Sequence, residues 1–209
     1  MEKAAIEFYF WTTPNGYKVA IFFEESSLPY RTVPIDILHG AQFAPEYLLI
    51  SPNNKIPAIV DHDGPGGAPV SIFESGAILI YLAEKVKRFL PRDARARIET
   101  LEWLFFQVGG FGPSLGQAHH FRKFAQEKIP YAIERYTKEA QRLYGVLDTR
   151  LTGREFIVDE YSIADMATYP WVAWHAWQGV DLADYPAVER WFNAVGARPA
   201  VQRAMAIKL

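Results

Sequence analysis

Every segment of this sequence with the alternating pattern of a β-strand lies before residue 74, and the patterns after that point are helical. A charged, proline-containing passage at 88–94 separates the two halves. Strands mixed with helices in one half and helices alone in the other predict an α+β chain of two domains. We expect a domain at 1–87, a linker at 88–94 and an all-helical domain at 95–209. The expected strands are 6–10, 30–35, 56–61 and 70–73.

Two helices are expected among these strands. Thr13 and Pro14 suit a helix start after the first strand, and the apolar run at 19–23 continues that helix. A second helix is expected at 77–85, with Ser75 placed to cap it. The order is therefore strand, helix, strand, hairpin and helix.

The second half has one long amphipathic helix and a tryptophan-rich one. Apolar residues recur at helical spacing over 130–151. The segment Ser162-Ile163-Ala164-Asp165 has the form of a capping box that opens a helix running toward Pro170. Aromatic residues at helical spacing are most often core, so we assign the tryptophans to packing. They are Trp171, Trp174 and Trp177.

The composition argues against a protein thiol, a nucleic-acid partner, a membrane span and a metal site. There is no cysteine, so any thiol chemistry has to use sulfur that a ligand brings. A net charge of -2 gives no dense positive field, so we expect no nucleic-acid partner. No apolar run approaches the roughly 20 residues of a membrane helix, and Met1 to Ala5 lack a secretory pattern, so we expect a cytoplasmic protein without membrane contact. Adjacent His119 and His120 point to different faces, and no metal is expected.

Three short segments carry a family resemblance. They are 13–16 (TPNG), 50–61 (ISPNNKIPAIVD) and 73–78 (FESGAI), and in order and spacing they are similar to the glutathione-site signatures of the glutathione transferase superfamily. In the helical half, 109–113 (GGFGP) and 161–165 (YSIAD) resemble its Nu class of bacterial disulfide-bond oxidoreductases. The resemblance implies a thioredoxin-like βαβ-ββα domain followed by an all-α domain.

One departure from the family pattern is visible before the YSIAD segment. The family usually has a glycine shortly before it, whereas this chain has the approach 156–160 (FIVDE). The resemblance therefore does not predict the conformation of this turn, while the proposed ligand site is unaffected.

The start of the second helix offers groups for the γ-glutamyl end of glutathione. Ser75 and nearby backbone N–H groups can donate to a carboxylate at the positive helix end, and Glu74 can take the ammonium group. Taken alone, these residues are equally compatible with a simple helix start. The resemblance favours the ligand role, and it also implies a cis peptide before Pro57, with Ile56 backbone groups pairing with the cysteinyl unit.

The junction of the first strand and first helix offers donors for a sulfur. Thr13 and Asn15 can stabilise a thiolate with a hydroxyl, an amide and helix-end N–H groups, and we predict them as the catalytic residues. A turn and helix cap is the alternative for this segment. Tyr9 is a further candidate because several transferase classes use a tyrosine there, and we rank it below Thr13 and Asn15.

The resemblance also implies contacts to the carboxylates of glutathione. Gln42 and Lys55 correspond to contacts with the glycyl end, and Arg135 to a contact with a carboxylate. Solvated loop residues are the alternative for the first two. For Arg135 the alternative is an ion pair with Glu139 on the same helix.

The function that the resemblance implies is reduction of small disulfides by an activated glutathione thiolate, with oxidised glutathione as product. Conjugation of glutathione to electrophiles and peroxide reduction use the same thiolate and stay open. A regulatory or binding protein on the same fold, such as a yeast nitrogen regulator that the chain also resembles, is a rival of another class. The family implies a homodimer.

Overall fold

A computed structural model describes residues 5–209, which form two compact units. The first unit contains the chain up to Arg88 together with Pro199–Leu209, and the second is Phe89–Arg198. Residues 199–209, which the sequence placed with the helical half, therefore belong to the first unit. The units are defined by packing, and the predicted glutathione-binding domain at 1–87 and helical domain at 95–209 stay predictions.

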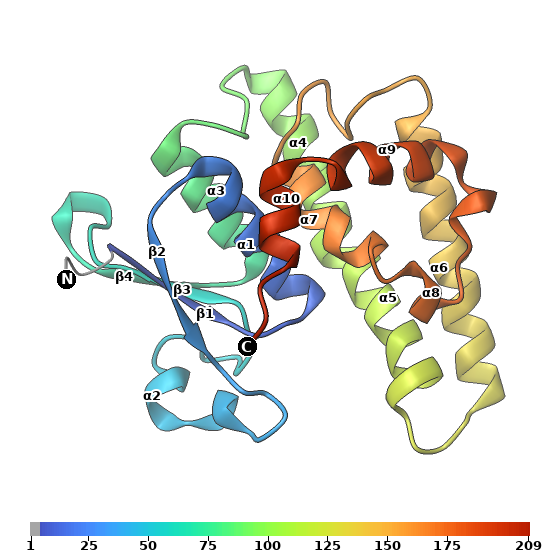
Figure 1. The fold of residues 1–209 in the computed structure, drawn as a ribbon, viewed down its shortest axis with the longest axis horizontal. Coiled ribbons are helices and arrows are strands. Elements are labelled where there is room, and N and C mark those ends of the chain that lie inside the picture. The colour runs from blue at the N-terminus through green and yellow to red at the C-terminus, as the bar shows by residue number, and fades with distance from the viewer. Residues whose placement is uncertain (1–4) are drawn as a thin grey trace. The chain divides into compact units, whose positions relative to one another are not determined.

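The first unit is built on a four-stranded mixed sheet in the order β2-β1-β3-β4 (Figure 1). β1 pairs parallel with β2 and antiparallel with β3, and β3 pairs antiparallel with β4 as the predicted hairpin. The parallel pair requires a crossover, which α1 supplies. The strands are β1 (Ile6–Phe10), β2 (Tyr30–Pro34), β3 (Ala58–Asp61) and β4 (Val70–Phe73), and the helices are α1 (Pro14–Ser26), α2 (Pro45–Leu48), α3 (Ser75–Val86) and α10 (Pro199–Met205).

Alternation along β1 assigns its side chains to the two faces of the sheet. Ile6, Phe8 and Phe10 are fully buried, and Phe10 contacts Tyr17 of α1 at a ring distance of 5.5 Å. Tyr9 points the other way and packs on a smaller apolar cluster around Tyr47 of α2. The sheet thus has a large core on one face and a smaller one on the other.

The second unit is helical throughout, and the α+β class predicted for the chain is confirmed. The predicted long helix is α6. Short π-helical turns at 107–111 and 120–124 follow α4 and α5, and one of them contains Gly109 and Gly110. The helices are α4 (Ala94–Phe106), α5 (Gly112–His119), α6 (Pro130–Leu151), α7 (Ile163–Val172), α8 (His175–Gln178) and α9 (Pro186–Gly196).

The predicted capping box at the start of α7 is confirmed and is fully buried. Asp165 accepts hydrogen bonds from the backbone N–H groups of Ser162 and Ile157 and from Nε1 of Trp191. These bonds satisfy donors that would otherwise be unpaired in the core. No residue of the approach 156–160 has a positive φ, so these five residues turn without a glycine; the nearest glycine before them, Gly153, has φ 72°.

Two details of the segment that contains α7 and α8 differ from the sequence expectation. The helix continues past Pro170 to Val172, because a proline in the last turn removes only one helical hydrogen bond. Trp171 is core, as predicted, and its ring lies 5.5 Å from that of His119. Trp177 is 37% exposed, so the packing assignment holds only in part.

Candidate functional site

At the junction of β1 and α1, the Thr13 hydroxyl is available as a donor. Thr13 is the N-cap of α1, and its Oγ1 accepts a hydrogen bond from Gly16 N–H at 3.2 Å. The Thr13 N–H donates to the Trp11 carbonyl at 2.8 Å, so the backbone donor at this position is already used. A threonine hydroxyl that accepts one bond still has its own hydrogen to donate. The half-buried Asn15 follows in the first turn, near the positive helix end.

Gly16 permits this close junction. A Cβ on Gly16 would lie 2.4 Å from the Trp11 carbonyl oxygen and 2.8 Å from the Phe10 ring. No larger residue fits without moving the Trp11 backbone, directly after β1. The glycine of the TPNG segment is therefore required by packing.

Tyr9 already has a partner within the protein. Its hydroxyl donates to Glu7 Oε2 at 2.9 Å, and burial together with that hydrogen bond raises the pKa of Tyr9 to about 12. Arg31 also donates to the Glu7 carboxylate at 2.7 Å, which holds the hydrogen-bond acceptor in place. This arrangement favours Thr13 and Asn15 over Tyr9 as partners of a sulfur.

The Ile56–Pro57 peptide is cis, as the resemblance implied. The Lys55 carbonyl accepts hydrogen bonds from Tyr47 Oη at 2.7 Å and Ser51 Oγ at 2.8 Å. These bonds fix the backbone directly before the cis peptide. The strand β3 begins at Ala58, two residues later than predicted. Ile56 makes no backbone hydrogen bond to another described residue, so its N–H and C=O can pair with an extended ligand.

The two residues expected at the glycyl end are placed differently. Lys55 is exposed. Gln42 is half-buried, and its Nε2 donates to the Ile37 carbonyl over a long 3.4 Å. Its Oε1 is buried without a partner among the described residues, so the Gln42 amide is only partly satisfied.

The start of α3 differs from the capping prediction. Ser75 is the first helical residue and does not cap the helix; the N-cap is Glu74, whose side chain makes no capping hydrogen bond. Glu74 has φ 72° and ψ 116°, a conformation that is costly for a residue with a side chain and that often occurs at ligand sites. The N–H groups of Ser75, Gly76 and Ala77 have no partner among the described residues, which suits an anion.

Sequence reasoning missed a residue that contacts Ser75. Lys18 of α1 is 2% exposed, and its Nζ donates to Ser75 Oγ at 3.3 Å. Burial lowers the pKa of Lys18 to about 7, although the Glu74 carboxylate acts in the opposite direction. A single lysine among the otherwise apolar residues 17–23 was the signal, because a buried cation is rare unless it has a specific partner.

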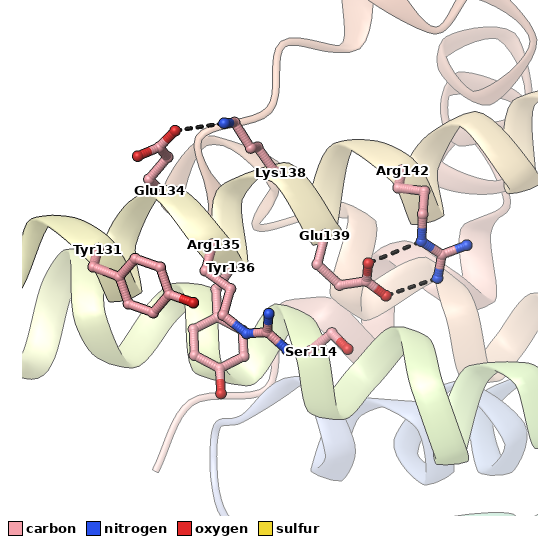
Figure 2. Close-up of a pocket in the computed structure, with 8 residues that line it drawn as sticks. All are labelled: Ser114, Tyr131, Glu134, Arg135, Tyr136, Lys138, Glu139 and Arg142. Carbon is pink, nitrogen blue, oxygen red and sulfur yellow. Dashed lines mark hydrogen bonds and ion pairs between the residues drawn. The ribbon is translucent and has the colours of Figure 1, made fainter.

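Arg135 lies in the second unit and lines a cavity of about 570 Å³ beside α6. The alternative ion pair with Glu139 is wrong, because Glu139 accepts two hydrogen bonds from Arg142 at 2.7 and 2.8 Å. Figure 2 shows that pair and a contact between Glu134 and Lys138, but no bond to Arg135. The exposed Arg135 guanidinium therefore has all its donors available within the described part of the chain.

His119 and His120 behave differently. The buried ring of His119 lies within 6.0 Å of three tryptophan rings, and burial lowers its pKa to about 4. His120 is exposed. Within residues 5–209, no group of three or more His, Asp or Glu side chains is arranged to hold a metal ion. No helix in the same range is long and apolar enough to cross a membrane.

Comparisons with known proteins match the whole chain. Residues 12–85 match the family model of the glutathione S-transferase N-terminal domain, and 111–199 that of the C-terminal domain. Disulfide-bond oxidoreductase YfcG of Escherichia coli is 56% identical over 204 residues, 96% of this chain and 94% of that protein.

Two solved structures have the same fold. A glutathione transferase from Pseudomonas putida, with one glutathione disulfide bound per subunit, is 42% identical and has a TM-score of 0.95 over 100% of this chain and 94% of that one. A family member from Pseudomonas fluorescens, with two glutathiones bound, is 45% identical with a TM-score of 0.92 over 98% and 94%. The two family models and the relative that is 56% identical along nearly its full length show that this chain belongs to the glutathione S-transferase family.

Proposed function

We propose that this chain reduces small disulfides with glutathione. The thiolate of one glutathione attacks the substrate disulfide, which forms a mixed disulfide and releases one substrate thiolate that takes up a proton. A second glutathione thiolate attacks the mixed disulfide, which releases the other substrate thiol and leaves glutathione disulfide. Two glutathiones thus supply the two electrons. The protein forms no covalent bond to the substrate.

The observation that carries this proposal is the absence of cysteine in a chain 56% identical to a protein named as a disulfide-bond oxidoreductase. A disulfide reductase without its own thiol has to take both sulfurs from ligands. One relative was solved with two glutathiones bound and another with one glutathione disulfide bound per subunit, so binding of two glutathione units occurs on this fold.

Thr13 and Asn15 are the proposed activating groups. The Thr13 hydroxyl can donate to a sulfur at the start of α1, since its acceptor position is filled by Gly16 N–H. Asn15 adds an amide donor in the first helical turn. Donors that bind the thiolate better than the thiol lower the thiol pKa and raise the thiolate fraction near neutral pH.

Two further groups of residues are proposed to hold the glutathione backbone. Ile56 backbone groups, before cis Pro57, pair with the cysteinyl unit. Glu74 takes the γ-glutamyl ammonium, and Ser75 with the free N–H groups of α3 takes the adjacent carboxylate.

The remaining proposed contacts are to carboxylates. The exposed Lys55 ammonium and the Gln42 amide meet the glycyl carboxylate, and the available guanidinium of Arg135 meets a glutathione carboxylate in a charge-assisted bond. We further propose a Nu-class homodimer located in the cytoplasm, since glutathione-dependent thiol chemistry requires a reducing compartment.

A calorimetric titration with reduced and with oxidised glutathione, combined with an assay of 2-hydroxyethyl disulfide reduction, tests the proposal. We expect both forms to bind and the disulfide to be consumed with one oxidised glutathione formed per substrate. Binding of reduced glutathione alone, with faster turnover of an aryl halide or a peroxide, would assign the chain to conjugation or peroxide reduction. Absence of binding by both forms would favour a regulatory role.

A further inference from the structure

A buried cation lies behind the residues proposed to bind the γ-glutamyl end. Lys18 is 2% exposed and Ser75 is 7% exposed, and Lys18 Nζ lies 3.3 Å from Ser75 Oγ. The two residues come from different helices, α1 and α3, which pack against each other. A buried ammonium group is costly unless it is compensated, and the Ser75 hydroxyl is one of the groups that Lys18 contacts.

The chemistry of the two groups fixes the direction of this hydrogen bond. A lysine ammonium only donates hydrogen bonds, whereas a serine hydroxyl both accepts and donates. A serine oxygen that accepts from Lys18 therefore directs its own hydrogen away from Lys18, toward the N-terminal end of α3. That end also presents the N–H groups of Ser75, Gly76 and Ala77, which have no partner within residues 5–209. All donors there then face the same region.

We propose that Lys18 is a positioning residue for glutathione, which orients the Ser75 hydroxyl as a donor and supplies the buried positive charge that balances the γ-glutamyl carboxylate. This inference rests on the proposed function, because it concerns the same binding site. It adds a residue that does not itself touch the ligand.

Ligand binding is expected to change the protonation of Lys18. Burial lowers the pKa of Lys18 to about 7, and Glu74 is the charged group that counteracts this. On the neighbouring α10, Arg203 pairs with Glu24 of α1, so its charge is already compensated. A carboxylate that arrives at Ser75 favours the ammonium form of Lys18. Ligand binding above pH 7 therefore draws a proton into the protein.

The test is calorimetric titration with S-methylglutathione at pH 8, in buffers of different ionisation enthalpy. The methylated sulfur cannot ionise, so the thiol contributes no proton to the measurement. We expect wild type to take up close to one proton per bound ligand. Lys18→Met is expected to lose the uptake and to weaken binding about 10-fold to 100-fold, as for a lost hydrogen bond to a charged group.

A double substitution separates positioning from a general loss of structure. If Lys18 acts through Ser75, then Ser75→Ala in the Lys18→Met background has little additional effect on affinity. In the disulfide assay, Lys18→Met raises KM for glutathione while kcat stays close to wild type. The matched control is Lys85→Met, which removes a lysine that pairs with buried Asp61 at 2.8 Å in the same unit. That variant is expected to lose stability but to keep the proton uptake.

Each result has a distinct meaning. Wild type that fails to bind S-methylglutathione or glutathione refutes the proposed function. Wild type that binds without proton uptake, or a Lys18→Met variant that binds as wild type does, overturns the role of Lys18 alone. Should Lys18→Met fail to fold, the comparison of wild type with Ser75→Ala still decides, because loss of Ser75 is expected to reduce the uptake.

Discussion

The hydroxyl of Tyr9 donates a hydrogen bond to the carboxylate of Glu7 at 2.9 Å, two residues earlier on the same strand. Residues i and i+2 of a strand share one face of the sheet, so this bond is local to β1. The carboxylate favours the protonated tyrosine, and burial acts in the same direction, so the pKa of Tyr9 rises to about 12. Tyr9 therefore keeps its hydroxyl hydrogen at neutral pH, and Glu7 accepts that hydrogen.

Tyr9→Phe is expected to leave glutathione-dependent turnover nearly intact. We expect kcat to fall less than about 10-fold, whereas loss of a group that transfers or stabilises the reacting proton typically costs about 100-fold or more. Steady-state kinetics of disulfide reduction measure this. A fall of 100-fold in a folded variant would make Tyr9 the activating residue and would displace Thr13.

Thr13→Ala is expected to change both catalysis and stability. Loss of one hydrogen bond to a thiolate raises the pKa of the bound thiol by about one unit, so the pH–rate profile shifts up by that amount. Loss of the helix cap costs about 1 kcal/mol of unfolding free energy. Thr13→Ser keeps the hydroxyl and serves as control for both effects. An unchanged pH profile in Thr13→Ala would exclude the hydroxyl as the donor.

Glu74→Gly is expected to separate affinity from stability. Glycine tolerates the positive φ of 72° at this position, so the unfolding free energy rises by about 1 kcal/mol, while glutathione binding weakens because the carboxylate is gone. Lys87→Gly is the matched control, since Lys87 has φ 57° at the other end of α3. That variant is expected to gain stability and to keep its affinity. Equal affinity in both variants would remove Glu74 from the site.

His119 makes stability depend on pH. Its pKa is about 4 in the folded protein and 6.5 in a free histidine, so the unfolded chain binds more protons between these values. The unfolding free energy of wild type therefore falls as the pH drops from 6.5 to 4, by about 3 kcal/mol from this residue. Denaturant unfolding of wild type and His119→Phe at several pH values isolates the effect.

Patterns local in sequence predicted much of the fold. The capping box at Ser162, the helix 130–151 and the four strands each depend on residues a few positions apart, and all were found. The cis peptide before Pro57 followed from the family resemblance, since no local pattern of this chain specifies it.

The site was harder to predict because its residues meet through tertiary packing. The connection between β4 and α3 decides which residue has the positive φ before the helix. That residue is Glu74, which is also the N-cap, although the sequence predicted Ser75 as the cap. The burial of Lys18 depends on α3 covering that face of α1. The alternative ion pair of Arg135 with Glu139 does not form, since Glu139 accepts from Arg142 on the same helix.

The packing of α10 on α1 joins the two ends of the described chain in one unit. Tyr17 Oη donates to the Ile207 carbonyl, and Arg203 pairs with Glu24, across sequence separations of 190 and 179 residues. During synthesis on the ribosome these contacts cannot form until the whole helical unit has been translated. The unit that carries Thr13 and Ser75 therefore completes its packing only after the helical unit has been translated, which links formation of the proposed glutathione site to synthesis of residues 199–209.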